Sequence, residues 1–493
     1  MVYYSNFFQL TSRIRNMMRG KILLGSILLI STLTLLAGLF MHFQASPKLT
    51  PLTPELSKHA AMRDSKGVFY PGALEEVKTL IVAAKEDRVK ICLVGTGMSQ
   101  NSQNNGGNGF LLMNLKKMNH VEIDAKQKTA TIQGNVTFSE MEQEANKHKL
   151  ATKVRQASGI FGIVSSICTN VHGWDLKAGC IEHTVRTLYV LDSDCNEIIA
   201  QQGDLIFKNT VGSFGGTYLI YGAVIELTDN IPLEGVFIER DTVEEALEEL
   251  PGFDDDVDMG LITVGRTKCY LRKFSAVSRT PTVSKDLKPE GTLGTYAERL
   301  LIDVVRTCAL LRLKKPVEWV YEQILLKTLS TPQKMLRNEF MNVSVNAINK
   351  PLKGVLYHHK VCLVEYFVKK EDVPDLVELF RKEYSNTIVL NAALRFVKAQ
   401  KNSCSIYAKT DMYALVICWD QRQDPAGLKR SQQRNERILE FLADRSGTFY
   451  MAYKNKPEDI ASFYPEFVRN LNIHNTIFSN QMIEAIRNVS PPA

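Results

Sequence analysis

Three stretches of the sequence combine glycine with small polar residues, the types that let a backbone pass close to a bound ligand. The first is 94-VGTGMSQNSQNNGGNG-109, between two apolar runs that predict buried strands at residues 89–94 and 110–115. The others are 158-SGIFGIVSSICTNVHG-173 and 211-VGSFGGTYLI-220. Because such residues turn tightly and present many backbone N–H groups, the three loops could together cradle an anion. A long surface connection is the alternative for the first loop.

The first loop matches neither familiar nucleotide-binding motif. It lacks the Lys-Ser/Thr ending of a P-loop, and GTGMSQ does not complete G-x-G-x-x-G. Apolar periodicity predicts a helix at 71–87, strands at 89–94, 110–115, 120–124 and 129–136, and a helix at 138–149. This order is typical of an α+β fold and not of a strict βαβ repeat, which weakens a dinucleotide-fold interpretation.

Four short motifs follow one another in a set order along the chain. They are Pro-x-x-x-x-Glu-Val at 71–77, G-T-G-x-S at 95–99, V-H-G at 171–173 and VGSFGG at 211–216. This order resembles the FAD-binding domain of the vanillyl-alcohol oxidase and p-cresol methylhydroxylase (PCMH) superfamily. The pieces QNNGG, NVHGWD, VEYFV and YPEFVRNLNIHNTIFSN look most like decaprenylphosphoryl-ribose oxidase, with aldonolactone and alditol oxidases and sterol Δ24-reductase as further relatives.

The resemblance implies an FAD held by the three loops. Its expected contacts are Gly95, Thr96, Gly97, Met98, Ser99 and Gln100 in the first loop, Ser158, Gly159, Ser165, Ser166, Thr169, Asn170, His172 and Gly173 in the second, and Gly212, Gly215 and Ile220 in the third. Many relatives carry a histidine at the position of Met98 and bond it to the flavin. A thioether does not form that bond in the usual way, so non-covalent FAD is expected here. The family's glycine pair in the second loop is replaced by Val164 and Ser165.

The part of the chain after Asp229 is expected to cover the reactive side of the flavin. Strands are predicted at 260–264, 268–274, 361–370, 394–400 and 413–420, and a helix at 373–384, so an antiparallel sheet with helices on one face is expected. In the resembled proteins such a sheet presents polar groups to the sugar, which makes Glu365, Arg395 and Lys398 the substrate-side candidates. Tyr453 falls where relatives carry a lysine, and Lys454 is next to it.

Flavin-dependent oxidation of an alcohol needs a polar group within hydrogen-bond reach of the hydroxyl. The candidates for that catalytic role are His172, Tyr450, Tyr453 and Lys454. A single histidine is more often a structural residue with a satisfied hydrogen bond. Reduction of a C=C bond would instead need a proton donor at the same flavin face, and the sequence does not separate the two directions.

Metal sites are not indicated. Cysteines are scattered and form no Cys-x-x-Cys pair, which argues against zinc and a disulfide scaffold. Asp241 is expected to cap a helix, and the Asp254–Asp256 triplet is expected to be charged surface. Residues 297–340 look helical, with basic residues among leucines. They would form an ordinary amphipathic helix or, alternatively, a membrane-surface helix that gathers a lipid-linked substrate.

The amino terminus predicts a membrane anchor. Residues 22–40 carry no charge and are long enough to cross a bilayer as a helix. Arginine and lysine residues precede this run, so the positive-inside rule places the amino terminus in the cytoplasm and the rest of the chain on the far side. A cleaved signal peptide is the alternative. The leader holds much of the net charge of +7, and no basic stripe remains to suggest nucleic acid.

The expected organisation is a basic cytoplasmic leader (1–21), a transmembrane helix (22–43), a linker (44–54), a two-subdomain FAD-binding domain (55–229), a substrate domain (230–445) and a C-terminal segment that returns to the FAD site (446–493). The first function hypothesis is a membrane-anchored FAD oxidoreductase that takes hydride from a CH–OH group of a sugar, sugar lactone, polyol or lipid-linked sugar. A C=C reductase of the sterol Δ24-reductase type and a catalytically inactive flavin-binding interaction protein are the alternatives. The electron acceptor is unknown.

Overall fold

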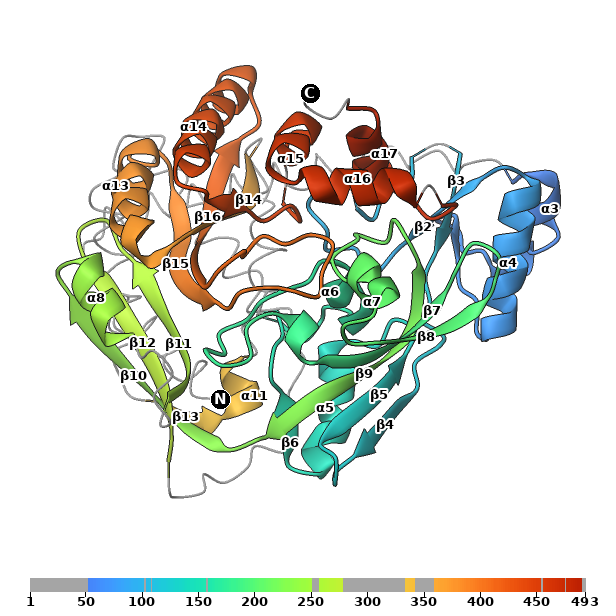
Figure 1. Ribbon diagram of the computed structural model, residues 1–493, viewed down its shortest axis with the longest axis horizontal. Helices are drawn as coiled ribbons and strands as arrows, with labels where there is room; N and C mark the ends of the chain where they lie inside the picture. The colour runs from blue at the N-terminus through green and yellow to red at the C-terminus, as the bar shows by residue number, and fades with distance from the viewer. Residues whose placement is uncertain are drawn as a thin grey trace, which may run out of the picture.

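Three β-sheets carry the fold in the computed structural model (Figure 1). The structure describes residues 52–101, 103–107, 109–156, 158–250, 257–277, 333–341, 359–453, 455–474 and 476–489. Sheets and helices are both present, and the strands are largely antiparallel outside one small sheet, so the predicted α+β class is confirmed. The predicted transmembrane helix, the Asp254–Asp256 triplet, most of 297–340 and Lys454 lie outside these residues.

The smallest sheet is parallel and holds the start of the first glycine loop. Its strands are β1 (Val68–Phe69), β2 (Lys90–Leu93) and β3 (Phe110–Met113), in the order β1-β3-β2. Helix α4 (Leu74–Glu86) covers it with the predicted apolar face, on which Val77, Leu80 and Ile81 are fully buried. A short helix α3 (Pro54–Ser57) is tied to the end of α4, since Asp87 accepts hydrogen bonds from Thr53 and from the Leu56 N–H.

A second sheet of antiparallel strands supports the other two glycine loops. Its order is β4 (Val121–Asp124), β5 (Thr129–Gln133), β9 (Leu219–Asp229), β7 (Val185–Leu191) and β8 (Glu197–Gln201), and β6 (Leu150–Thr152) also pairs with β9. Helix α5 (Phe138–Lys147) begins with a capping box between Thr137 and Glu140. The short helices α6 (Ile163–Cys168) and α7 (Leu205–Thr210) lie in the second loop and just before the third.

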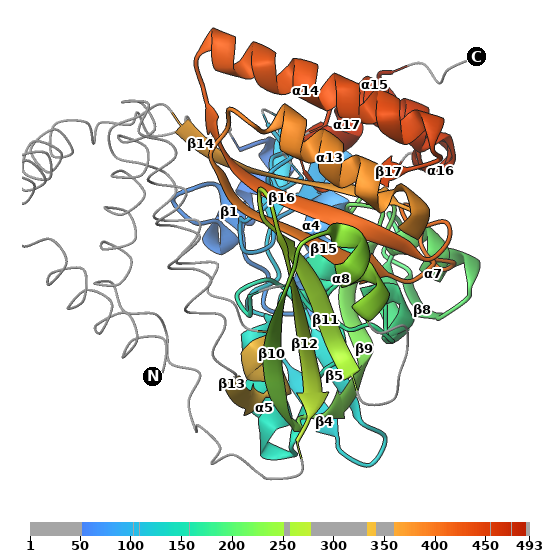
Figure 2. The ribbon, with the colours of Figure 1, turned by 90° about the vertical axis from the view of Figure 1, so that its left-hand side faces the viewer.

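The third sheet has eight strands and belongs to the second half of the chain. Its order is β13 (Gln333–Leu336), β10 (Pro232–Arg240), β12 (Cys269–Ala276), β11 (Val257–Val264), β15 (Val389–Val397), β16 (Met412–Arg422), β14 (His359–Val368) and β17 (Thr448–Phe449). Helices α8 (Val243–Glu249), α13 (Val373–Glu383) and α14 (Pro425–Asp444) lie on one face, as Figure 2 shows. The expected sheet with helices on one face is therefore present.

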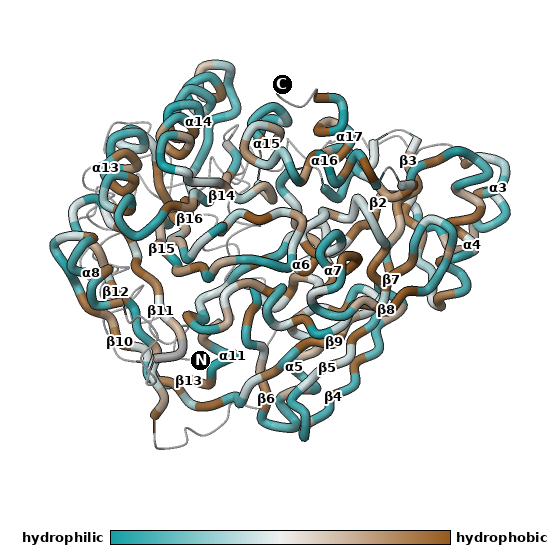
Figure 3. The backbone as a smooth tube through the Cα atoms, viewed as in Figure 1, coloured by the Kyte–Doolittle hydropathy of each residue, from teal (hydrophilic) through white to brown (hydrophobic). Residues whose placement is uncertain are grey.

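Residue alternation along β14 decides which side chains face the helices. Tyr366 points to the helical face, where its hydroxyl donates to Asn435 Oδ1 on α14 at 3.1 Å. Its neighbours Glu365 and Phe367 therefore point to the opposite face. Figure 3 shows apolar residues along the strands, and the outer helices bury only part of their surface: on α14 the buried apolar residues are Ile438, Leu439 and Leu442.

The end of the chain joins the sheets. Helices α15 (Pro457–Phe463), α16 (Pro465–Ile473) and α17 (Gln481–Arg487) follow β17 in the order of the chain. Phe478 forms a parallel bridge with Ile91 of β2, and Asn480 donates to the Phe214 carbonyl at 2.9 Å. The segment after β17 thus contacts both the small sheet and the third glycine loop.

Two predictions for the second half of the chain are wrong. Thr242, and not Asp241, caps α8, because the Thr242 hydroxyl accepts a hydrogen bond from the Glu245 N–H at 3.2 Å. Residues 333–336 form strand β13 because they pair with β10, although residues 337–340 are helical (α11, Arg337–Phe340). None of the helices in the described ranges has the length and apolar character that a bilayer crossing requires.

Candidate active site

Three side chains from distant parts of the chain meet where the second glycine loop lies against the large sheet. His172 follows α6, Glu365 stands in the middle of β14, and Tyr453 follows β17. His172 Nε2 lies 2.5 Å from Glu365 Oε2, and the Tyr453 hydroxyl donates to Glu365 Oε1 at 3.0 Å. Both His172 and Glu365 are 4 % exposed. We refer to His172, Glu365 and Tyr453 as the carboxylate cluster.

The Glu365 carboxyl is held in its ionised form. Burial alone would raise its pKa, but the charge and hydrogen bond of His172, followed by the charge of Arg395 and the Tyr453 hydroxyl, outweigh burial. The pKa of Glu365 is therefore below its ordinary value. An ionised carboxylate only accepts hydrogen bonds, so His172 Nε2 must carry the proton of this contact. The other ring nitrogen, Nδ1, is buried and has no partner among the described residues.

Aromatic rings surround the His172 imidazole. Its ring centroid lies 5.7 Å from that of Phe367 and 6.1 Å from those of Tyr407 and Tyr450. The Tyr450 hydroxyl donates to the Thr169 carbonyl at 2.8 Å, which anchors this ring to the second loop. Burial raises the pKa of Tyr407 and Tyr450 well above the ordinary value, and burial with the charge of Glu365 does the same for Tyr453. These phenols are neutral donors at physiological pH.

The two predicted basic substrate residues lie in different surroundings. Arg395 stands on β15, and its charge contributes to lowering the pKa of Glu365. Its Nε is buried without a partner in the described part of the chain. Lys398 is exposed and lies beside Gly179, because a Cβ at Gly179 would meet the Lys398 Cβ at 2.8 Å. Arg395 is thus close to the carboxylate cluster, whereas Lys398 is an exposed residue beside Gly179.

The first glycine loop leaves the edge of the small sheet with an open backbone. Gly97 has a φ of +79°, and no atom lies within 4 Å of the position that a Cβ would take. Thr96, Gly97 and Ser99 are exposed, while Met98 and Gln100 are half-buried. The loop is held by its ends, since the Asn114 side chain donates to the Gly95 carbonyl at 3.0 Å. Farther along, Gln103 Nε2 donates to the Ala452 carbonyl at 2.7 Å.

The second loop touches the first, because a Cβ at Gly95 would collide with Ser165 Oγ. Several of its predicted contact residues bond within the protein. Ser166 Oγ donates to the Gly162 carbonyl at 2.9 Å, and Thr169 Oγ1 donates to the Ser165 carbonyl at 3.1 Å. Ser158 and Asn170 are buried, Gly159 packs against Ser139, and Gly173 lies against the Arg155 backbone.

The third loop combines tight packing with one open glycine. A Cβ at Gly212 would collide with Ser405 Oγ, whereas Gly215, with a φ of +75°, has open space around its Cβ position. The Ile220 side chain is fully buried in the core of the six-stranded sheet, so it packs inward. Ser213 Oγ is buried without a hydrogen-bond partner in the parts of the chain that are described.

These features fit a bound dinucleotide. Gly97 and Gly215 offer open backbone in a conformation that favours glycine, and Ser213 Oγ and His172 Nδ1 are buried polar atoms with no hydrogen-bond partner among the described residues. Sequence reasoning missed Glu182, Gln400 and Tyr407, which pack beside the second loop. Their sequence neighbourhoods contain no glycine cluster or motif that would have drawn attention to them.

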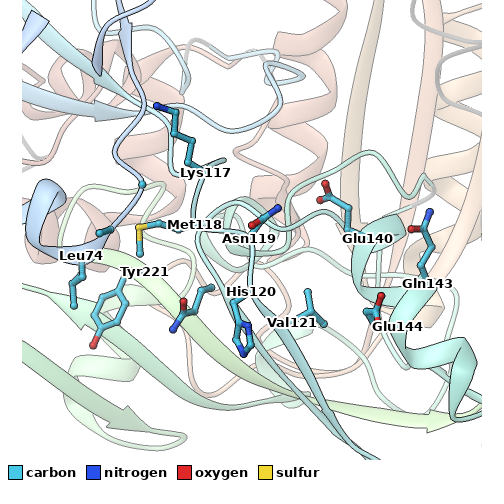
Figure 4. A pocket seen from close by; sticks show the side chains of 13 residues that line it. Leu74, Lys117, Met118, Asn119, His120, Val121, Glu140, Gln143, Glu144 and Tyr221 are labelled. Carbon is cyan, nitrogen blue, oxygen red and sulfur yellow. The ribbon is translucent and has the colours of Figure 1, made fainter. Parts of the chain in front are cut away.

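A separate open pocket of about 620 Å³ lies in the amino-terminal half of the chain (Figure 4). Its lining includes Lys117, His120 and Gln133 with Glu140 and Tyr221. None of the predicted site residues lines it. The pocket is therefore distinct from the three loops and from the carboxylate cluster.

Comparison with known proteins assigns the cofactor. Residues 65–199 match a protein family described as "FAD binding domain". This region contains the first two glycine loops, so the resemblance to PCMH-type FAD-binding proteins is confirmed for this domain and its cofactor is FAD. The chain is also similar to L-gulonolactone oxidase from Mus musculus (24% identical over 127 residues) and from Bos taurus (25% identical over 127 residues). Each match covers 26% of this chain and only 28% of the relative's length.

Proposed function

We propose that this protein is an FAD-dependent oxidoreductase that removes hydride from a CH–OH group of a sugar, sugar lactone, polyol or lipid-linked sugar. The carboxylate cluster is the observation that carries the proposal, because it puts a polarised histidine beside the FAD-binding loops. The similarity to two L-gulonolactone oxidases supports a hydroxylated sugar derivative as the donor.

The three loops would hold the cofactor. Gly97 and Gly215 would allow its close approach, and backbone N–H groups of the first loop would face its phosphates. Met98 stands where many relatives carry the histidine that bonds to the flavin, and its thioether does not form that bond in the usual way. The FAD is therefore held non-covalently. When bound, the flavin supplies the acceptor for a hydride.

The chain's own contribution is the removal of the hydroxyl proton. Glu365 accepts the Nε2–H of His172, so the base form of this imidazole carries its lone pair on Nδ1. In this role Nδ1 accepts the proton of the donor alcohol, and Glu365 stabilises the resulting imidazolium. Tyr453 holds the carboxylate from its other oxygen. Arg395 Nε, which is buried and has no partner within the described ranges, is suited to an oxygen of the same substrate.

The proposal includes a single membrane anchor at residues 22–43. The uncharged run from 22 to 40 and the basic residues before it support an amino terminus in the cytoplasm and a catalytic part on the far side. A flavoprotein is usually loaded with FAD in the cytoplasm, which is the argument for the opposite side. Protease treatment of sealed vesicles tests the orientation: protection of the catalytic part in right-side-out vesicles would contradict the proposed far side.

The experiment that tests the function is anaerobic titration of the purified FAD-loaded protein with L-gulonolactone, a panel of polyols and sugar lactones, and NADPH. The proposal predicts that a sugar derivative bleaches the visible flavin absorption while NADPH alone does not. If NADPH bleaches the flavin absorption and none of the sugar derivatives does, a C=C reductase is favoured. Stable absorption with every donor would favour a flavin-binding protein without catalysis.

A further inference from the structure

The loop between β15 and β16, residues 398–411, reaches from the large sheet into the FAD-binding domain (Figure 1). It is fastened there by backbone groups and one phenol. The Cys404 N–H donates to the Val211 carbonyl at 3.0 Å, beside the third glycine loop. The Tyr407 hydroxyl donates to the Asn170 carbonyl at 2.6 Å, in the second. One segment of the substrate half therefore bridges two of the three loops.

Glu182 attaches this loop through two backbone N–H groups. Its carboxylate is fully buried, and Oε1 accepts the N–H groups of Lys401 at 2.8 Å and Asn402 at 3.1 Å. The other oxygen, Oε2, accepts the Asn170 amide at 2.7 Å. The Glu182 N–H returns a bond to Asn170 Oδ1 at 3.2 Å. A buried carboxylate without such donors would be costly, so loop and carboxylate depend on each other.

Asn170 is thereby held on two sides. Its side chain is paired with Glu182, and its carbonyl accepts the Tyr407 hydroxyl. Its φ of +47° lies in the left-handed region, which is uncommon for residues with a Cβ but which asparagine tolerates better than most, and its two partners hold the turn in this conformation. His172 is two residues farther along, so the direction of its ring depends on this turn.

We propose that Glu182 is a positioning residue: it locks the 398–411 loop onto Asn170 and so holds His172 against Glu365. This inference goes beyond the proposed function and rests on it only for the role of His172. Substitution by glutamine tests it, because the new NH₂ group must face either the two loop N–H groups or the Asn170 amide. The first arrangement sets the NH₂ group against two N–H donors and the second against one, so either releases part of the lock.

The experiment is hydrogen exchange measured by mass spectrometry on the FAD-loaded protein, comparing wild type, Glu182→Gln and Thr184→Val. Thr184 is the matched control, since it is buried in the same turn but its hydroxyl bonds locally to the Ile181 carbonyl at 2.9 Å. In Glu182→Gln, peptides covering both 399–408 and 169–175 are expected to exchange about tenfold faster. In Thr184→Val these two segments should keep the wild-type rate relative to the rest of the chain.

Faster exchange in 399–408 with unchanged exchange in 169–175 would overturn the inference. A uniform increase in exchange along the chain would overturn it as well, because Glu182 would then stabilise the whole fold and not position His172. If Glu182→Gln does not fold, Tyr407→Phe removes the other bond to Asn170, and 169–175 is again expected to exchange faster. With an active donor in hand, the pH profile of flavin reduction should shift in Glu182→Gln and not in Thr184→Val. The exchange result stands even if no donor reduces the flavin, so the two proposals fail separately.

Discussion

His172 and Glu365 are separated by 193 positions in the chain, yet Nε2 of one lies 2.5 Å from Oε2 of the other in a buried setting. One residue belongs to a loop of the FAD-binding half and the other to the centre of the large antiparallel sheet. Their contact is therefore a junction between the two halves. It also fixes Nε2 as the imidazole nitrogen that carries the proton of this contact.

The pH dependence of stability should report the ionised state of Glu365. A carboxyl whose pKa is lower in the folded than in the unfolded protein stabilises the fold above the unfolded value of about 4.3, and this contribution is lost as the pH falls through the folded value. Urea denaturation should show Glu365→Gln to be less stable than wild type by about 1–3 kcal/mol at pH 7.

The difference between these two proteins should shrink below about pH 4.3 and be largely absent once wild-type Glu365 is protonated. A suitable control is Asp229→Asn, which loses an exposed pair with Lys128 (Nζ to Oδ2 2.7 Å). Its cost should be at most about 1 kcal/mol. An advantage of wild type over Glu365→Gln that persisted unchanged into strong acid would mean that Glu365 is not ionised in the folded protein.

Tyr453→Phe should act through the carboxylate. Loss of the hydroxyl removes one hydrogen bond to Glu365 and lowers the free energy of unfolding by about 1 kcal/mol. It should also slow flavin reduction by about tenfold or less, because His172 still holds the carboxylate. Tyr366→Phe is the control on the other face of the sheet, where the hydroxyl bonds to Asn435. Equal rates of flavin reduction in both variants would remove Tyr453 from the site.

Gly97→Ala separates backbone strain from cofactor contact. Gly97 and Gly203 both have a positive φ and open space at the Cβ position, but Gly203 lies in the turn between β8 and α7. The strain of alanine should therefore lower the free energy of unfolding of the apoprotein similarly in both, by about 1 kcal/mol. Only Gly97→Ala should also weaken FAD binding, by about tenfold, in a fluorescence titration of apoprotein. Equal FAD affinity in both variants would place the cofactor away from Gly97.

The flavin should leave the protein on acid denaturation. Met98 in the first loop offers no ordinary route to a covalent flavin bond, so precipitation with acid should leave FAD in the supernatant. If the flavin instead precipitates with the protein and remains attached to peptides when the precipitate is digested with protease, the cofactor is covalently linked at another residue.

Periodic segments of this fold could be predicted from the sequence, whereas contacts between distant segments could not. The apolar stripe of α4 and the alternation of β14 and β16 are local patterns, and they predicted these elements. Strand β13 was expected to be helical, because its pairing with β10 is not visible in its own residues. The predicted helix cap at Asp241 is likewise wrong by one residue, since the Thr242 hydroxyl caps α8.

The candidate site follows the same rule. The glycine loops can be recognised from their composition, and Glu365 became a candidate because the resembled proteins present polar groups from the strands of such a sheet. Its contacts with His172 and Tyr453 could not be predicted, because they depend on how the two halves of the chain pack together. Glu182 and Tyr407 carry no signal in one sequence, because a buried carboxylate and a buried phenol are recognisable only from their partners.

The central claim is that His172 takes the proton of a donor alcohol. The most direct test is the rate of flavin reduction by an active sugar donor under anaerobic stopped flow, in wild type and His172→Asn with equal FAD content. Loss of a positioned base should slow reduction by at least about 100-fold. Reduction of His172→Asn at the wild-type rate would contradict the account.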